Sequence, residues 1–160
     1  MGKEEKTNVM RILDAKKISY STHTYLDSNA ISAEEVAAFL NINPDKVFKT
    51  LVTVGKSNQH YVFMLPAKEE LDLKKAAKCV GEKSIEMIKS KELLPLTGYI
   101  HGGCSPIGMK KFFITTIHET AKEFDTICFS AGKIGYQIET STSELEKIIK
   151  VSYSDIIVSN

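Results

Sequence analysis

The segment GYIHGGCSPIG, residues 98–108, holds four of the chain's nine glycines. Gly102 and Gly103 tolerate positive φ and, without side chains, let backbone N–H groups approach a bound group. Pro106 fixes its own φ and keeps Ser105 extended, so the loop is stiff. Bare amides, the Ser105 hydroxyl and the lack of a carboxylate in this segment suit an anion or a developing oxyanion. A tight structural turn is the alternative interpretation.

Lys49 is the best single candidate for a catalytic side chain. It lies in the segment Val47–Val54, whose β-branched and apolar residues predict a strand. Alternation places Lys49 on one face with Leu51 and Thr53. A lysine among apolar neighbours either reaches water at a sheet edge or serves an anion. Partial burial would also lower its pKa unless an anionic ligand restores it. A solvated edge lysine is the alternative.

The thiols and imidazoles form no recognisable metal or nucleophile motif. Cys79, Cys104 and Cys128 are widely spaced, and no C-x-x-C or H-x-x-x-H pair occurs. We therefore expect neither a metal site nor a disulfide framework. Cys104 could act as a nucleophile with His101 or His118 as its base, but the loop has no Asp, Asn or Glu to orient either histidine. Packing beneath the loop is the favoured role for Cys104.

Two further segments bear on ligand binding. The sequence SAGKIG, Ser130–Gly135, lacks the G-x-x-x-x-G-K-[ST] spacing of a P-loop. We find no nucleotide-cofactor motif and expect no cofactor. Lys110 and Lys111 directly follow the glycine segment and could form a local basic patch with the three lysines of segment 72–80. For the latter group, a solvated helix face is the favoured interpretation.

The composition indicates an ordinary globular protein of one domain, 1–160. Hydrophobic residues make up 42% and charged residues 26%, and 21 basic against 20 acidic residues give a net charge of +1. Any RNA partner would therefore need a local basic patch. No apolar run approaches the ~18 residues of a membrane span, and the N-terminus lacks the apolar segment of a secretory signal. We expect a cytoplasmic protein without membrane association.

Sequence periodicity predicts helices and strands in irregular alternation. Helices are expected at 5–16, after the capping box Ser32–Glu35, after the N-cap Asp72, as a short turn at 90–94 that Pro95 stops, and from about Ser143. Strands are expected at 18–25, 47–54, 61–65, 84–88, 112–117, 126–130, 136–140 and within 151–158. Because strict βαβ alternation is missing, an α+β fold with a mixed sheet is favoured.

Three motifs taken together resemble a known family. They are Lys49-Thr50 in a strand, the Gly102–Gly108 loop followed by two lysines, and the Ser130–Gly135 turn, with Asp72-Leu-Lys-Lys between the first two. Their order and spacing are similar to those of the YbaK family of aminoacyl-tRNA deacylases, relatives of the editing domain inserted in bacterial prolyl-tRNA synthetases. The resemblance runs from about Val9 to Ile157.

The resemblance implies a free-standing hydrolase that removes cysteine mischarged onto proline tRNA, with the aminoacylated 3′ end as its substrate and prolyl-tRNA synthetase as a candidate partner. It implies a strongly curved, barrel-like mixed sheet flanked by helices. The family's catalytic lysine falls on Lys49, and its pocket positions fall on Tyr20, Thr50, Gly102, Gly103, Gly108 and Ser130; Ser105 joins them through its hydroxyl. Ile134 and Gln137 stand where arginine and aspartate are common.

An aminoacyl ester is already activated, so a protein that hydrolyses it must mainly orient it and stabilise the carbonyl oxygen. The Lys49 ammonium and the amides around Gly102 and Gly103 are the expected donors. The attacking group is either the substrate's own thiol or water. A non-catalytic module that binds an aminoacyl or nucleotide ligand, or docks on a synthetase, is the alternative, and a Cys104 thiol enzyme is a third reading. The sequence leaves open the amino acid, the tRNA and the oligomeric state.

Overall fold

The computed structural model describes residues 6–30 and 32–159. Its helices are α1 (Asn8–Ala15), α2 (Ala33–Leu40), α3 (Leu73–Val80), α4 (Ser90–Thr97) and α5 (Thr142–Leu145), with 3₁₀ turns η1 (Pro44–Lys46) and η2 (Glu119–Glu123). Its strands are β1 (Ser21–Thr24), β2 (Phe48–Gly55), β3 (His60–Pro66), β4 (Ile85–Met87), β5 (Ile114–His118), β6 (Ile127–Ser130), β7 (Tyr136–Thr140) and β8 (Val151–Ser154).

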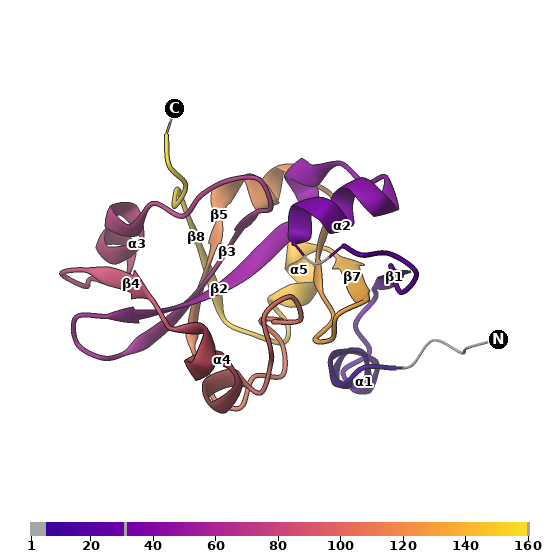
Figure 1. Cartoon of the computed structure of the whole chain (residues 1–160), viewed down its shortest axis with the longest axis horizontal. Coiled ribbons are helices and arrows are strands. Elements are labelled where there is room, and N and C mark those ends of the chain that lie inside the picture. Colours follow the sequence, from indigo (N-terminus) through magenta and orange to yellow (C-terminus); the bar gives the residue numbers. More distant parts are fainter. Residues whose placement is uncertain (1–5, 31, 160) are drawn as a thin grey trace.

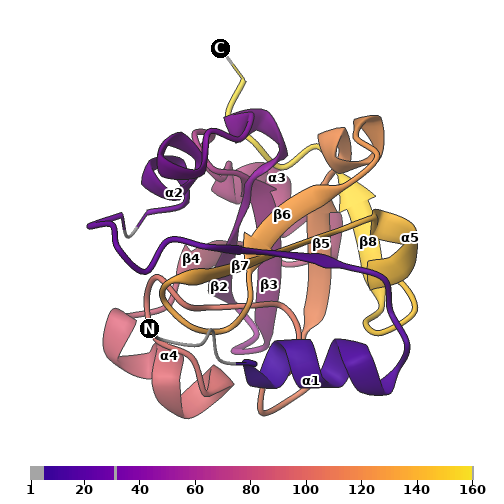
Figure 2. The same cartoon turned by 90° about the vertical axis from the view of Figure 1, so that its right-hand side faces the viewer.

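The strands form two sheets, and most of the core lies between them. The larger sheet has the order β4-β2-β3-β5-β8 and is mixed, because β2 is antiparallel to β3 and β4 whereas β3, β5 and β8 run parallel. The smaller sheet, β1-β7-β6, is antiparallel. In Figure 1 the smaller sheet lies to one side of the larger, and Figure 2 shows β1 and β7 crossing in front of β2 and β3. Buried Val52 and Met64 from one sheet share a cluster with Phe129 and Ile138 from the other.

The predicted α+β class and mixed sheet are confirmed, but the single barrel-like sheet is not found. Among the described strands, the two sheets are joined through an isolated parallel bridge between Val47 and Cys128, and they do not close into a barrel. At this bridge the beginning of β2 lies next to β6, and α2 packs over the contact through buried Ala37. The open corner between the two sheets is where the candidate site lies.

Local sequence signals fix most helix ends. At α2, the Ser32 Oγ accepts the Glu35 amide and the Glu35 Oε1 accepts the Ser32 amide, each at 3.1 Å, so the predicted capping box is confirmed. Asp72 caps α3 by accepting two backbone amides at 3.0 Å. The expected stop at Pro95 is wrong, because α4 continues through it to Thr97. The Thr97 hydroxyl donates to the Leu93 carbonyl at 2.8 Å and holds the last turn together beyond the proline.

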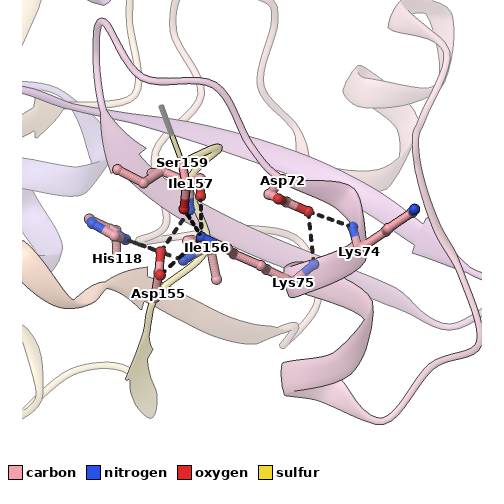
Figure 3. Close-up of polar contacts among 8 residues, drawn as sticks. All are labelled: Asp72, Lys74, Lys75, His118, Asp155, Ile156, Ile157 and Ser159. Atoms are coloured by element: carbon pink, nitrogen blue, oxygen red, sulfur yellow. Dashed lines mark hydrogen bonds and ion pairs between the residues drawn. The ribbon is translucent and has the colours of Figure 1, made fainter.

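The C-terminal segment 155–158 is fastened across the beginning of α3. The Asp72 amide donates to the Ile156 carbonyl and the Val158 amide to the Glu70 carbonyl, at 2.8 and 2.9 Å. Figure 3 shows the Lys75 ammonium reaching the same segment, where it donates to Asp155 Oδ2 at 3.0 Å and to a backbone carbonyl at 2.8 Å. Lys75 therefore has a structural role. The contact to the Glu70 carbonyl also fixes the loop that carries Glu69 and Glu70.

None of the helices in the described ranges combines the length and the apolar character needed to span a bilayer.

Candidate functional site

A cavity of about 440 Å³ opens at the corner between the two sheets. Its walls come from the start of α2, the first half of β2, the glycine loop and the ends of β6 and β7. The lining residues are Tyr25, Ser32, Ala33, Glu34, Val36, Phe48, Lys49, Thr50, Leu51, Ala67, Leu93, His101, Gly102, Cys104, Ser130 and Gln137. Segments far apart in the chain thus converge on one space large enough for a small ligand.

Lys49 lies on an open stretch of β2. The strand pairs with β3 along Phe48–Val54, but β4 pairs with it only at Thr53–Gly55, so the opposite edge is free beside Lys49. Its side chain is half-buried, and no hydrogen bond or ion pair joins its ammonium to any residue that the structure describes. Burial lowers the pKa of Lys49, and the carboxylates of Glu70, Glu34 and Glu69 partly offset this decrease. A half-buried cation with no partner among the described residues favours an anionic ligand.

Several polar atoms that border the cavity lack hydrogen-bond partners among the described residues. They are the hydroxyls of Tyr25 and Thr50 and the Oε1 of Gln137, all inaccessible to water. Buried polar atoms are normally paired, so an unpaired group needs an explanation. Three such atoms around one space are the pattern expected where a ligand supplies the missing bonds. The Ser130 hydroxyl also borders the cavity, but it accepts the Gly132 amide at 3.1 Å.

The glycine loop presents fewer free amides than its sequence suggests. The Gly103 amide donates to the Ile100 carbonyl at 2.9 Å, so it closes a turn instead of facing a ligand. The amides of Gly102 and Cys104, both at the cavity wall, have no acceptor among the described residues. Gly102 has φ of 87°, which an L side chain rarely adopts. The expected oxyanion donors of this loop are therefore Gly102 and Cys104, with Gly103 shaping the turn.

Four predicted substrate residues do not line the cavity. A Cβ at Gly103 would lie 3.2 Å from the Ile134 backbone nitrogen, so this glycine permits the loop to pack against the 131–135 turn. Ser105 is fully buried, and its hydroxyl accepts the amide two residues later. Gly108 has φ of 78°, and Tyr20 donates to Asp14 Oδ1 at 2.8 Å beside α1. Substrate contact by these four residues stays a prediction, whereas Lys49, Thr50, Gly102 and Ser130 share the cavity.

Cys104 borders the cavity without the surroundings of a nucleophile. Only 9% of the residue is exposed, and burial raises the pKa of its thiol to about 12. His118 lies elsewhere, with its Nδ1 accepting the Ile156 amide at 3.2 Å. His101 lines the cavity but is exposed, and no described residue orients its ring. These contacts favour the packing role for Cys104.

We expect Cys104→Ala to keep at least half of the wild-type rate on any substrate of this cavity, because a protonated thiol of this kind contributes volume and no chemistry. The loss of one small side chain beneath the loop should cost about 1 kcal/mol of unfolding free energy. Single-turnover rates, thermal melts and rates after treatment with an alkylating reagent would test this. A rate reduced a hundredfold would instead support the hypothesis that the Cys104 thiol is the nucleophile.

The fold also assembles residues that sequence reasoning overlooked. On the outer face of the smaller sheet, Glu139 Oε1 lies 2.7 Å from His23 Nε2 and Glu139 Oε2 lies 2.6 Å from the Lys46 ammonium. Cys128 is close enough that its thiol, the imidazole and the carboxylate lie within 4.8 Å of one another. Strand register could reveal this group, since Cys128 and Glu139 are direct cross-strand partners. The carboxylate oxygens are already engaged by the lysine and the histidine. Gln137 lies on the same face of the sheet and lines the cavity.

Comparisons with known proteins identify the family of the chain. The family model of the aminoacyl-tRNA editing domain matches residues 27–148. The "Putative Cys-tRNA(Pro)/Cys-tRNA(Cys) deacylase EbsC" of Enterococcus faecalis is 44% identical over 154 residues, which cover 96% of this chain and 94% of that protein. The proline–tRNA ligase of Pelobacter propionicus is 34% identical over 80 residues, half of this chain but only 14% of the ligase.

A solved structure shares the fold over nearly the whole chain. It is described as that of "a putative trans-editing enzyme for prolyl tRNA synthetase", with a TM-score of 0.79 at 21% identity, covering 94% of this chain and 97% of that one. This likeness supports the fold, and the family match supports the resemblance seen in the motifs around Lys49, Gly102 and Ser130. The chain therefore belongs to the aminoacyl-tRNA editing domain family.

Proposed function

We propose that this protein is a trans-editing deacylase that hydrolyses the ester of cysteine mischarged onto proline tRNA. The observation that carries the proposal is the half-buried Lys49 ammonium, which no described residue pairs with. It lies in a cavity that also offers the Thr50 hydroxyl and the Gly102 amide. Membership of the editing family and the name of the Enterococcus faecalis relative support this substrate class. The terminal adenosine with its aminoacyl group would occupy the cavity.

The chemistry requires charge stabilisation more than a protein nucleophile. Attack on the ester carbonyl puts negative charge on its oxygen, which the Lys49 ammonium and the free loop amides would stabilise. Collapse of this intermediate breaks the bond to the ribose oxygen, which leaves as a hydroxyl after taking a proton. With water as the nucleophile the product is free cysteine. With the substrate thiol the first product is a cyclic thioester, which water then opens. The protonated Cys104 thiol is not needed in either route.

The protonation state of Lys49 should set the alkaline limit of the reaction. Burial lowers the pKa of Lys49 from its usual 10.5, so the ammonium, and the rate with it, is lost at a lower pH than for an exposed lysine. Glu70→Gln removes the foremost of the carboxylates that offset this decrease. We therefore expect its rate to decline at a lower pH than that of the wild type.

Rates from about pH 6 to about 10, corrected for spontaneous ester loss, would test this expectation. Glu123→Gln on the exposed η2 turn is a control with the same charge change. A Glu70→Gln profile that overlays the wild type would remove Glu70 from this role. Equal displacement in both variants would indicate a general charge effect.

The direct test follows ester loss from proline tRNA charged with labelled cysteine, at substoichiometric protein. Alanine-charged and correctly charged proline tRNA would be assayed in parallel. Multiple turnovers confined to the cysteine ester would support the proposal and favour thiol-assisted attack. Loss of the alanine ester instead would keep the site and change the amino acid. Binding without turnover on all three would leave the non-catalytic module as the better account.

This function would place the protein in the cytoplasm with mischarged tRNA as its main ligand. Prolyl-tRNA synthetase is the natural candidate for a protein partner, since proline–tRNA ligases carry a related segment. One domain, residues 1–160, would carry the reaction, with the cavity formed by residues between Tyr25 and Gln137.

A further inference from the structure

The glycine loop also borders a second, smaller cavity. This space of about 240 Å³ is lined by Pro106, Gly108, Met109, Lys110, Lys111, Phe112, Phe113, Thr115 and Ile149. The loop thus contributes Gly102 and Cys104 to the first cavity and Pro106 and Gly108 to the second. The two cavities are therefore joined through neighbouring residues of one short loop. The volume of the second cavity suits a group the size of one nucleobase better than a drug-sized ligand.

The lining of the second cavity combines positive charge with aromatic surface. Among the residues that the structure describes, it includes Lys110 and Lys111 and no aspartate or glutamate. Both lysines are exposed, and no hydrogen bond or ion pair engages either ammonium within the described ranges. Phe112 is 68% exposed, more than any other large hydrophobic residue described. Proteins bind single-stranded nucleic acid through this combination. Lysine side chains contact the phosphates, and the bases stack on aromatic rings.

Hydrogen bonds hold the glycine loop as far as Lys110, at the edge of the second cavity. The Gly98 amide donates to the Leu94 carbonyl at 2.8 Å, and the Lys110 amide donates to the Thr97 carbonyl at 3.1 Å, so both ends of the loop are tied to α4. Inside the loop, the Tyr99 hydroxyl donates to the Ile107 carbonyl. A fixed cradle lowers the entropy cost of binding.

We propose that this second cavity binds a nucleotide of the single-stranded RNA just before the substrate's terminal adenosine. Lys110 and Lys111 contact the phosphates, and the base packs on Phe112. This inference rests on the proposed function, which identifies the ligand as charged tRNA. It assigns another part of that ligand to a separate site. The lysines of α3 do not offer the same combination, because Lys75 is engaged by the C-terminal segment and Lys74 and Lys78 border neither cavity.

The first test measures binding without catalysis. A fluorescein-labelled single-stranded RNA that ends in CCA is titrated with the wild-type protein and with Lys110→Gln/Lys111→Gln, and the anisotropy is followed at several salt concentrations. We expect about tenfold weaker binding for the double variant. The slope of log K against log salt should fall by about 1.4, since each lost phosphate contact removes about 0.7 for a single strand. Phe112→Ala should weaken binding at least fivefold, as the loss of one base-stacking contact does.

The matched control is Lys74→Gln/Lys78→Gln, which removes the same charge from exposed positions on α3. It should keep the affinity within twofold of the wild type. The salt slope should equal that of the wild type within experimental error. Equal losses in the two lysine pairs would overturn the proposal in favour of unspecific attraction. Unchanged RNA affinity in the Lys110 and Phe112 variants would also overturn it, and weakened binding to prolyl-tRNA synthetase in those variants would then identify the surface as a protein interface.

A second test separates this site from the first cavity. The cysteinyl ester of adenosine occupies only the first cavity, so Lys110→Gln/Lys111→Gln should hydrolyse it at the wild-type rate, while its KM for charged tRNA rises about tenfold. A wild-type protein that hydrolyses neither ester would refute the proposed function, whereas the RNA titration would still decide whether the second cavity binds a nucleotide. Equal losses on both esters would show that the loop variants disturb the first cavity and would overturn the assignment.

Discussion

Lys49→Met is expected to lower the rate of cysteinyl-tRNA deacylation at least a hundredfold and to leave the protein folded. Methionine keeps much of the length of the lysine stem but removes the charge that faces the developing oxyanion in the proposed mechanism. The loss of one such donor typically costs a factor of 10² to 10³ in kcat. Stability should be equal or higher, because the wild type keeps an ammonium half-buried without a partner among the described residues.

Single-turnover rates and urea unfolding of the same preparation would measure both quantities. Lys56→Met is a matched control, because this exposed lysine follows β2 at its far end and borders neither cavity. Lys49→Arg adds a diagnostic step: it keeps the positive charge but replaces a compact ammonium with a planar fork, so partial activity would show that charge matters more than shape. A Lys49→Met rate within threefold of the wild type would contradict the assignment.

Sequence reasoning succeeded where one short segment determines the outcome. The capping box at Ser32 and the N-cap at Asp72 act within four residues, so their effects could be predicted without the fold. The strand around Lys49 was likewise predicted from its local residue pattern, and the structure contains it as β2. The stop expected at Pro95 failed because a proline near the end of a helix costs one hydrogen bond, which the Thr97 hydroxyl and an exposed surface can offset.

Only part of the candidate site could be predicted from the sequence, because its walls depend on tertiary placement. Gly102 and Gly103 are adjacent and identical in type, yet one amide is free at the cavity and the other closes a turn. No sequence pattern distinguishes them. Tyr25 directly follows β1 and Gln137 lies in β7, and these two strands meet only in the smaller sheet. The open edge beside Lys49 exists because β4 is short. The two-sheet arrangement likewise depends on where β2 leaves β4 and approaches β6.

Glu139→Gln is expected to be the most destabilising of the substitutions considered. The Glu139 side chain is only 20% exposed and accepts from the Lys46 ammonium, with His23 and Thr126 as further partners. Burial alone would raise the pKa of Glu139, but hydrogen bonds from Lys46, Thr126 and His23 lower it to about 2. Removing one charge of a fully buried pair costs about 3–5 kcal/mol, and partial exposure reduces our expectation to about 2–3 kcal/mol at neutral pH.

The same carboxylate predicts a pH dependence with a definite sign. A carboxyl group whose folded pKa lies below its usual 4.5 stabilises the fold fully above pH 4.5, and that contribution is lost as the pH falls toward about 2. The gap in unfolding free energy between wild type and Glu139→Gln should therefore be widest near neutral pH and should narrow across this acid range. Urea unfolding at several pH values would measure it, with Glu123→Gln as a control that changes the free energy by less than about 0.5 kcal/mol.

The outcome also bears on the candidate site, because Glu139 shares its sheet face with Gln137, and its cross-strand partner Cys128 is bridged to Val47, two residues before Lys49. If the network around Glu139 holds this corner in place, Glu139→Gln should weaken substrate binding as well as stability. A variant that lost activity at full stability would instead give Glu139 a direct part in the reaction. A gap of constant width from neutral pH to about pH 2 would show that its charge is not what stabilises the corner.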